Sequence, residues 1–176
     1  KHDCDNFQDL VREGLITPQE LEDIRVGYDF LLQARCCLHF MTGNPEYLTV
    51  AQRFSHKAIM EPLAEGRDYL DGLHANTQVP KIVGFQRVYE ATGDTKYSAA
   101  AAFFWETVTR TRSFATGGHG DNEHFFAMAD FSKHVFSAKG SETCCQYNML
   151  KLTPALFLHD PRAEYADYYE RALIII

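Results

Sequence analysis

Apolar residues recur with a helical period along most of the chain, and the pattern repeats. The stretches TGNPEYLTVAQRF and TGDTKYSAAAAFF begin at Thr42 and Thr92, 50 residues apart, and a looser copy, HDPRAEYADYYERAL, begins at His159. In the first two copies a glycine supplies the left-handed residue that ends one helix, and another helix starts within a few residues. The repeat therefore predicts a series of helical hairpins.

Capping signals place the helix starts within this pattern. Asn44-Pro45 and Asp160-Pro161 each combine an N-cap residue with a proline at the first helical position, and Asp94 serves as the cap of the middle copy. Upstream, Thr17-Pro18-Gln19-Glu20 has the form of a capping box, in which the Thr and Glu side chains bond each other's backbone N–H groups.

These boundaries predict three helix pairs: about 18–41 with 45–60, 77–91 with 95–112, and 142–158 with 161–176. Pro154 is expected to kink the fifth helix. No segment shows the alternation of a β-strand, so the predicted class is all-α. Repeated hairpins stack to bury their apolar faces, either as an open solenoid or as a closed α/α toroid, and three pairs would form about half of a six-hairpin ring.

Composition restricts the classes of function. The chain has 176 residues, 45% of them hydrophobic and 23% charged, as in a globular domain. Its net charge of −7 argues against a nucleic-acid partner or an anionic membrane surface, because phosphate binding needs clustered Lys and Arg. No apolar run approaches the ~18 residues that a membrane helix requires.

The ends of the chain suggest a fragment. It starts at Lys1 and stops at Ile176, within an apolar helical run that has no cap. Half a ring would expose apolar helix faces that the other half covers, so we expect the isolated chain to be inactive and to aggregate or remain partly ordered.

The five cysteines do not form a disulfide framework. Their number is odd and two pairs are adjacent in sequence, which favours reduced thiols or metal ligands; the five are Cys4, Cys36, Cys37, Cys144 and Cys145. The first adjacent pair lies in the apolar helical stretch LLQARCCLHF, where both residues are expected in the core.

Two connections break the helical rhythm, 61–76 and the longer 113–141. The longer one, about 29 residues rich in Phe and poor in charge, should be packed and should line a central cleft. Its TGGHGDNEHF stretch is the densest polar cluster, with glycines that would let the backbone approach a ligand. Glu123, flanked by aromatic residues, could have a raised pKa and act as a general acid. The alternative is a glycine-rich turn with solvated acidic groups.

The stretch GSETCC suggests a metal site. If Ser141 caps the following helix, Glu142 and Cys144 could reach one cation from its first turn, where the helix N-terminus favours a thiolate. Cys145 would point elsewhere, into the core. The alternative is two buried cysteines behind a glutamate of the capping region.

A carboxylate and one thiolate are too few for zinc, which normally takes four ligands. His119, His124 or residues beyond Ile176 could supply the others.

Three motifs together carry a family resemblance. TGGHGDNEHF, SAKGSETCCQYNMLKLT and GLHANTQVPKIVGFQRVYEATGDTKY, in the same relative order, resemble the zinc-dependent bacterial β-L-arabinofuranosidases. These are retaining glycosidases with an (α/α)6 barrel and a cysteine nucleophile. The resemblance covers about residues 42–176, whereas the first 40 residues match poorly. It implies that residues 1–176 are an incomplete fragment of an (α/α)6-barrel glycosidase catalytic domain.

The resemblance also implies roles for individual residues. Glu123 would be the general acid/base, His74 would bind the sugar, and Glu142 and Cys144 would be two of the zinc ligands. The family's other two zinc-binding cysteines, one of them the nucleophile, would lie in a second Cys-rich motif beyond this chain. The implied substrate is a plant-derived glycan that carries arabinofuranosyl units.

Two other functions stay open at this point. Another sugar enzyme on an α/α toroid, such as an epimerase or a lyase, would use a catalytic His pair and no thiolate zinc site. A scaffold module could present the concave face of a helical solenoid without any chemistry.

Overall fold

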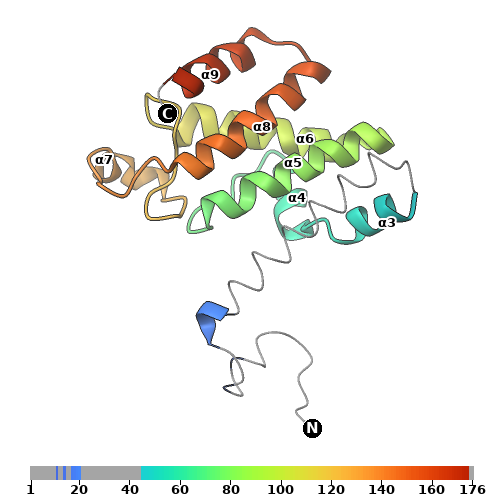
Figure 1. Cartoon of the computed structure of the whole chain (residues 1–176), viewed down its shortest axis with the longest axis horizontal. Coiled ribbons are helices and arrows are strands. Elements are labelled where there is room, and N and C mark those ends of the chain that lie inside the picture. Colours follow the sequence, from blue (N-terminus) through green and yellow to red (C-terminus); the bar gives the residue numbers. More distant parts are fainter. Residues whose placement is uncertain (1–10, 12–13, 15–16, 21–44, 175–176) are drawn as a thin grey trace.

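The computed structural model describes residues 11, 14, 17–20 and 45–174, and the regular structure within this part is helical (Figure 1). Isolated bridges occur between loops, but the described residues contain no strand. The all-α class is therefore confirmed. The elements are α3 (Pro45–Arg53), α4 (Lys57–Ala64), α5 (Ala75–Thr92), α6 (Thr95–Thr107), the π-helix η1 (Val108–Arg112), the short 3-10 helix η2 (Met128–Asp130), α7 (Phe131–His134), α8 (Thr143–His159) and α9 (Ala163–Ile174).

The two later hairpins are present, α5 with α6 and α8 with α9, and the turn of the first of them is as predicted. Between α5 and α6, Gly93 adopts a left-handed φ of 75°, and its N–H donates to Tyr89 O at 2.7 Å. Asp94 caps α6 by accepting a hydrogen bond from the Lys96 N–H at 3.1 Å. The repeat TGD thus closes one helix and opens the next within three residues.

Two predicted boundaries are wrong. The helix expected over 45–60 is interrupted after Arg53, because the Ser55 hydroxyl bonds Ala51 O and Tyr97 Oη and so competes with the backbone. The last hairpin also differs at its turn. Asp160 ends α8 instead of capping α9, since its N–H donates to Leu156 O, and α9 starts at Ala163.

Most of the helix predicted over 18–41 lies outside the described residues, with Cys36 and Cys37 in it, and so do Cys4 and the predicted cap Asn44. The capping box itself is confirmed. The Thr17 N–H donates to Glu20 Oε2 at 2.7 Å, and the Glu20 N–H donates to Thr17 Oγ1 at 3.1 Å. Helix α8 runs from Thr143 to His159 with Pro154 inside it, and the kink there stays a prediction.

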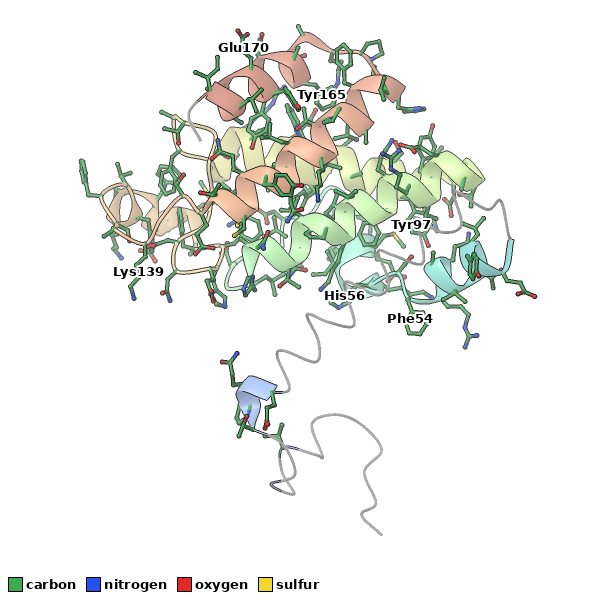
Figure 2. The ribbon with its side chains drawn as sticks, viewed as in Figure 1. Phe54, His56, Tyr97, Lys139, Tyr165 and Glu170 are labelled. Atoms are coloured by element: carbon green, nitrogen blue, oxygen red, sulfur yellow. The ribbon has the colours of Figure 1, made fainter. Side chains whose placement is uncertain are left out.

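The helices pack in a layered arrangement around α6. Figure 1 shows α5, α6 and α8 side by side, with α9 against α8, while α4 packs on α6. Trp105 of α6 is buried where these helices meet, and its indole N–H donates to Thr153 Oγ1 at 2.9 Å. Tyr165 and Tyr168 of α9 pack edge-on against the indole, with ring centroids 4.4 and 5.6 Å away (Figure 2 labels Tyr165). These aromatic contacts hold α9 to the core.

The end of α6 departs from ideal geometry. The predicted helix 95–112 does reach Arg112, but its last five residues form the π-helix. There the hydroxyls of Thr109 and Thr111 bond Trp105 O and Thr107 O, at 2.8 and 2.6 Å, and compete with backbone donors for these carbonyls. The π-turn places the buried side chain of Arg112 against the connection before α5.

The segment from 113 to 142 carries η2 and α7. The prediction that the connection 113–141 is packed holds only as far as Phe125, since no residue from 126 to 141 is buried and Phe136 is 94% exposed. Phe125 and His119 within it are buried. No helix in the described part of the chain combines the length and apolarity needed to cross a bilayer.

Candidate catalytic and metal site

Two helix N-termini meet at one end of the helical layer, joined by the Glu123 backbone. His74 is the N-cap of α5 and Glu142 is the N-cap of α8. The Ala75 N–H donates to Glu123 O at 2.7 Å, and the Glu123 N–H donates to Glu142 Oε1, also at 2.7 Å. The structure therefore brings together the four residues that the sequence indicates, since Cys144 lies in the first turn of α8.

The side chains of His74 and Glu123 face each other. His74 Nε2 lies 3.7 Å from Glu123 Oε2, and the Glu123 side chain is 66% exposed. His74 Nδ1 is buried and has no hydrogen-bond partner among the described residues. The expectation that aromatic neighbours desolvate Glu123 is wrong, because the carboxylate is open to solvent. The pair can thus present a carboxylate and an imidazole to a bound molecule.

A carboxylate and two sulfurs cluster beside this pair. Cys144 Sγ lies 3.6 Å from Glu142 Oε2, and one ligand atom from each of Glu142, Cys144 and Cys145 lies within 4.8 Å of the others. Cys145 is fully buried, as predicted, but the expectation that it points away from the group is wrong. This is the one group of three or more potential metal-ligating side chains found in the described part of the chain.

Burial and charge act against thiolate formation at this group. Burial raises the pKa of Cys144, and the negative charge of Glu142 raises it further. Burial also raises the pKa of Cys145 far above its ordinary value. Both effects act against the thiolate that we expected the helix N-terminus to favour. A divalent cation at this group would supply the missing positive charge.

The loops around the site carry backbone strain. Asn122, Glu123 and Ser141 have positive φ angles of 48°, 70° and 61°, in a region that residues with a side chain rarely adopt. Ser141 is not the cap of α8, contrary to the prediction. Its N–H instead donates to Gly120 O at 3.1 Å, and Glu142 takes the capping position.

The glycines of TGGHGDNEHF allow close approach, but to the protein itself. A Cβ on Gly118 would lie 2.0 Å from Ser141 Oγ, and one on Gly120 would lie 3.3 Å from Ala75 Cβ. The segment before Glu123 therefore needs small residues in order to pass between the start of α5 and the start of α8.

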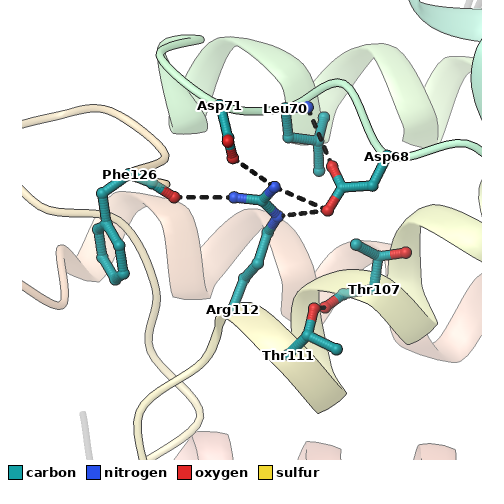
Figure 3. Close-up of polar contacts among 7 residues, drawn as sticks. All are labelled: Asp68, Leu70, Asp71, Thr107, Thr111, Arg112 and Phe126. Carbon is teal, nitrogen blue, oxygen red and sulfur yellow. Dashed lines mark hydrogen bonds and ion pairs between the residues drawn. The ribbon is translucent and has the colours of Figure 1, made fainter. Parts of the chain in front are cut away.

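A buried arginine fixes the loop that carries His74 (Figure 3). Arg112 Nε donates to Asp68 Oδ2 at 2.8 Å, Nη2 donates to Asp71 Oδ1 at 2.6 Å, and Nη1 donates to Phe126 O at 3.0 Å. This clamp, which consists of Arg112 with Asp68, Asp71 and the Phe126 carbonyl, was not predicted from the sequence. Arg112 is the last residue of a helical run, and nothing in the local sequence pairs it with a loop about 40 residues earlier.

Backbone hydrogen bonds continue the clamp toward the site. The Gly72 N–H donates to Phe125 O at 2.7 Å, and the Phe125 N–H donates to Leu73 O at 2.9 Å. Together with the bond from Ala75 to Glu123, they tie residues 72–75 to residues 123–125. This short ladder sets His74 beside Glu123.

Neither histidine suggested as a further ligand joins the three-residue group in the described structure. His119 is fully buried and stacks on Phe125, with ring centroids 5.4 Å apart and an interplanar angle of 13°. Burial lowers the pKa of His119 to about 4. His124 Nδ1 bonds Asn122 O at 2.8 Å, and its ring lies next to His74. His119 is thus a core residue, and His124 supports the strained turn.

A family model described as "Beta-L-arabinofuranosidase, GH127 catalytic domain" matches residues 18–174. No curated protein matches the chain at a significant level. The chain belongs to this family of β-L-arabinofuranosidase-like glycoside hydrolases, and the resemblance noted in the sequence is confirmed.

Proposed function

We propose that the protein, as a member of this family, removes terminal β-L-arabinofuranosyl units from plant-derived glycans, and that Glu123 is the general acid/base. The observation that carries the proposal is the solvent-exposed Glu123 carboxylate, whose Oε2 lies 3.7 Å from His74 Nε2. The backbone N–H of the same residue donates a hydrogen bond to the Glu142 carboxylate. We also propose that residues 1–176 are part of an (α/α)6 catalytic domain.

Glu123 would act in two proton transfers. It would first protonate the glycosidic oxygen as the bond to the sugar breaks, and its carboxylate would then take a proton from the water that releases the sugar. Its exposure supports this role, because a leaving group and a water molecule must both reach the carboxylate. The turn with positive φ at Asn122 and Glu123 would hold the carboxylate in place.

His74 would bind and orient the sugar. Its ring contacts His124, and its backbone is fixed as the N-cap of α5, so the imidazole is already positioned. One imidazole nitrogen can donate to a sugar hydroxyl while the other accepts a hydrogen bond. The nucleophile of the retaining reaction is not assigned to any described residue.

Glu142 and Cys144 would hold zinc. The donor set suits this ion, because zinc in proteins is bound by carboxylate oxygen and cysteine sulfur, and the Cys145 sulfur lies within reach of the same position. When bound, zinc would keep coordinated thiols deprotonated at neutral pH. The bond from the Glu123 N–H to Glu142 Oε1 would orient this ligand, as outer hydrogen bonds do in metal sites.

The test is hydrolysis of p-nitrophenyl β-L-arabinofuranoside by the full-length protein loaded with zinc. Glu123→Gln should lower kcat by about 10²–10⁴-fold, because the variant cannot transfer the proton. Glu170→Gln, which removes an exposed carboxylate on α9, is the matched control and should keep wild-type activity (Figure 2). Equal activity of the two variants would contradict the role of Glu123. If the folded wild-type protein does not hydrolyse this compound, the proposed substrate is wrong.

A further inference from the structure

A cleft of about 630 Å³ lies between the start of the 113–142 segment, α7 and the N-terminus of α8. Phe114 and Phe131 line it, with ring centroids 5.5 Å apart, and Ser141 and Gln146 add polar groups. Clefts of this size with aromatic walls and a few polar groups are typical of small-ligand sites. Sugars suit such walls, because their C–H faces pack on aromatic rings while their hydroxyls need hydrogen bonds.

His134 of α7 also lines the cleft, and its imidazole is held on two sides. Its Nδ1 lies 2.5 Å from Asp121 Oδ2, and its ring stacks on Phe126 with centroids 4.0 Å apart and an interplanar angle of 13°. The Ser137 hydroxyl donates to the other carboxylate oxygen, Asp121 Oδ1, at 2.7 Å. Both oxygens of the carboxylate are therefore engaged.

The hydrogen bond from His134 lowers the pKa of Asp121, so this side chain is an ionised acceptor. The Nδ1 of His134 is then the donor, which leaves Nε2 to accept a hydrogen bond from a ligand. A side chain already fixed by its neighbours loses little conformational entropy when a ligand binds.

The cleft and the candidate catalytic site share two loop segments. Asp121 lies two residues before Glu123, and Ser141 in the cleft wall directly precedes Glu142. The Ser141 N–H bonds Gly120 O, so the two loop segments are joined between the cleft and the site. These shared segments are the basis for placing a sugar in the cleft next to the sugar whose bond Glu123 would protonate.

We propose that this cleft binds the sugar unit on the leaving-group side of the cleaved bond, with His134, oriented by Asp121, bonding one of its hydroxyls. This rests on the proposed glycosidase function. The occupant is a pentose or hexose unit of the glycan, since the walls combine two aromatic rings with neutral polar groups and an imidazole. If the His134–Asp121 pair only stabilises the loop, replacing His134 should reduce activity equally on substrates with different leaving groups.

The kinetic test compares two substrates of the full-length protein: p-nitrophenyl β-L-arabinofuranoside, and a disaccharide with the same terminal sugar. His134→Phe keeps a ring to stack on Phe126 but removes the polar nitrogens. We expect kcat/KM for the disaccharide to fall about tenfold more than kcat/KM for the aryl glycoside, mainly through KM, as one lost hydrogen bond implies. Lys133→Ala, at the exposed neighbouring position on α7, is the control and should change neither. Equal losses on the two substrates would overturn the subsite.

A second measurement does not depend on turnover or on the folding of the His134 variant. The imidazole proton resonances of His134 are followed by NMR in the Glu123→Gln protein while the disaccharide is added. A saturable shift supports the subsite. No shift at the highest soluble concentration overturns it. A wild type that hydrolyses neither substrate while the His134 resonance still shifts would contradict the arabinofuranosidase proposal and retain the sugar site.

Discussion

Arg112 Nη2 lies 2.6 Å from Asp71 Oδ1, although the two residues come from the end of the π-helix and from the connection before α5. The same guanidinium pairs with Asp68, and the arginine side chain is 5% exposed. These ion pairs join the end of the π-helix to the connection before α5, whose residues 72–75 are tied to residues 123–125 by backbone hydrogen bonds.

Replacing Arg112 should therefore weaken the fold. Arg112→Ala leaves Asp68 partly buried without its partner and should lower the free energy of unfolding by about 3 kcal/mol, measured by urea denaturation. Arg112→Lys should restore only part of the lost stability, because an ammonium group cannot reproduce the planar set of hydrogen bonds that the guanidinium makes. Arg110→Ala, at an exposed position of the same π-helix, is the control. The clamp is not important for stability if Arg112→Ala and Arg110→Ala melt alike.

Stability should also depend on pH through His119. The folded-state pKa of about 4 lies below the ordinary value of 6.5, so folding favours the neutral ring. The stability that this residue contributes is complete above pH 6.5 and is lost as pH falls toward 4. The loss amounts to about 3 kcal/mol. His119→Phe keeps the stacking on Phe125 and should remove this part of the pH dependence, measured by denaturation at a series of pH values. If the free energies of unfolding of the variant and the wild type change in parallel with pH, the role of His119 would be contradicted.

Substitutions of Cys144 and Cys145 should differ in their effect on zinc affinity. Glu142→Gln and Cys144→Ser should each lower zinc affinity at least tenfold, because they remove proposed ligands; competition with a chromophoric chelator measures this. Cys145→Ala should retain zinc and instead lower the free energy of unfolding by about 1–2 kcal/mol, since the side chain is fully buried. If Cys145→Ala loses zinc as readily as Cys144→Ser, all three side chains ligate the ion.

Gly118 and Ser141 should show strong coupling. A Cβ at Gly118 would lie 2.0 Å from Ser141 Oγ, so Gly118→Ala should destabilise the protein by about 1–3 kcal/mol. Ser141→Gly removes the obstructing hydroxyl and also relieves the positive φ of 61°. The double variant should consequently be nearly as stable as Ser141→Gly alone, as a double-mutant cycle by thermal denaturation would show. Additive effects would rule out this steric contact.

The sequence predicted the helices best where local signals decide the structure. The left-handed residue at Gly93 and the cap at Asp94 are short-range features, and the hairpin they define is present. The interruption at Ser55 and the π-turn before Arg112 were missed, because both depend on hydroxyl groups that compete for backbone carbonyls once the helices are packed. Such competition leaves no periodic signal.

The site was predictable only in part, for the same reason. Glu142 and Cys144 are two residues apart, so their proximity follows from local geometry. His74 and Glu123 are far apart in sequence, and only the family resemblance placed them in one site. The ladder between residues 72–75 and 123–125 brings them together, and tertiary contacts of this kind cannot be read from spacing.

The π-turn at the end of α6 also makes the site sensitive to one kind of change in chain length. A π-turn accommodates one residue more than an α-turn over the same stretch. Deleting one residue from 109–111 would therefore return the helix to regular α geometry and keep Arg112 on about the same side of the helix axis. Adding one residue there would instead rotate Arg112 by about 100° away from Asp68, without any change in its identity. Single-residue insertions in this turn are thus expected to be as damaging as loss of the arginine itself.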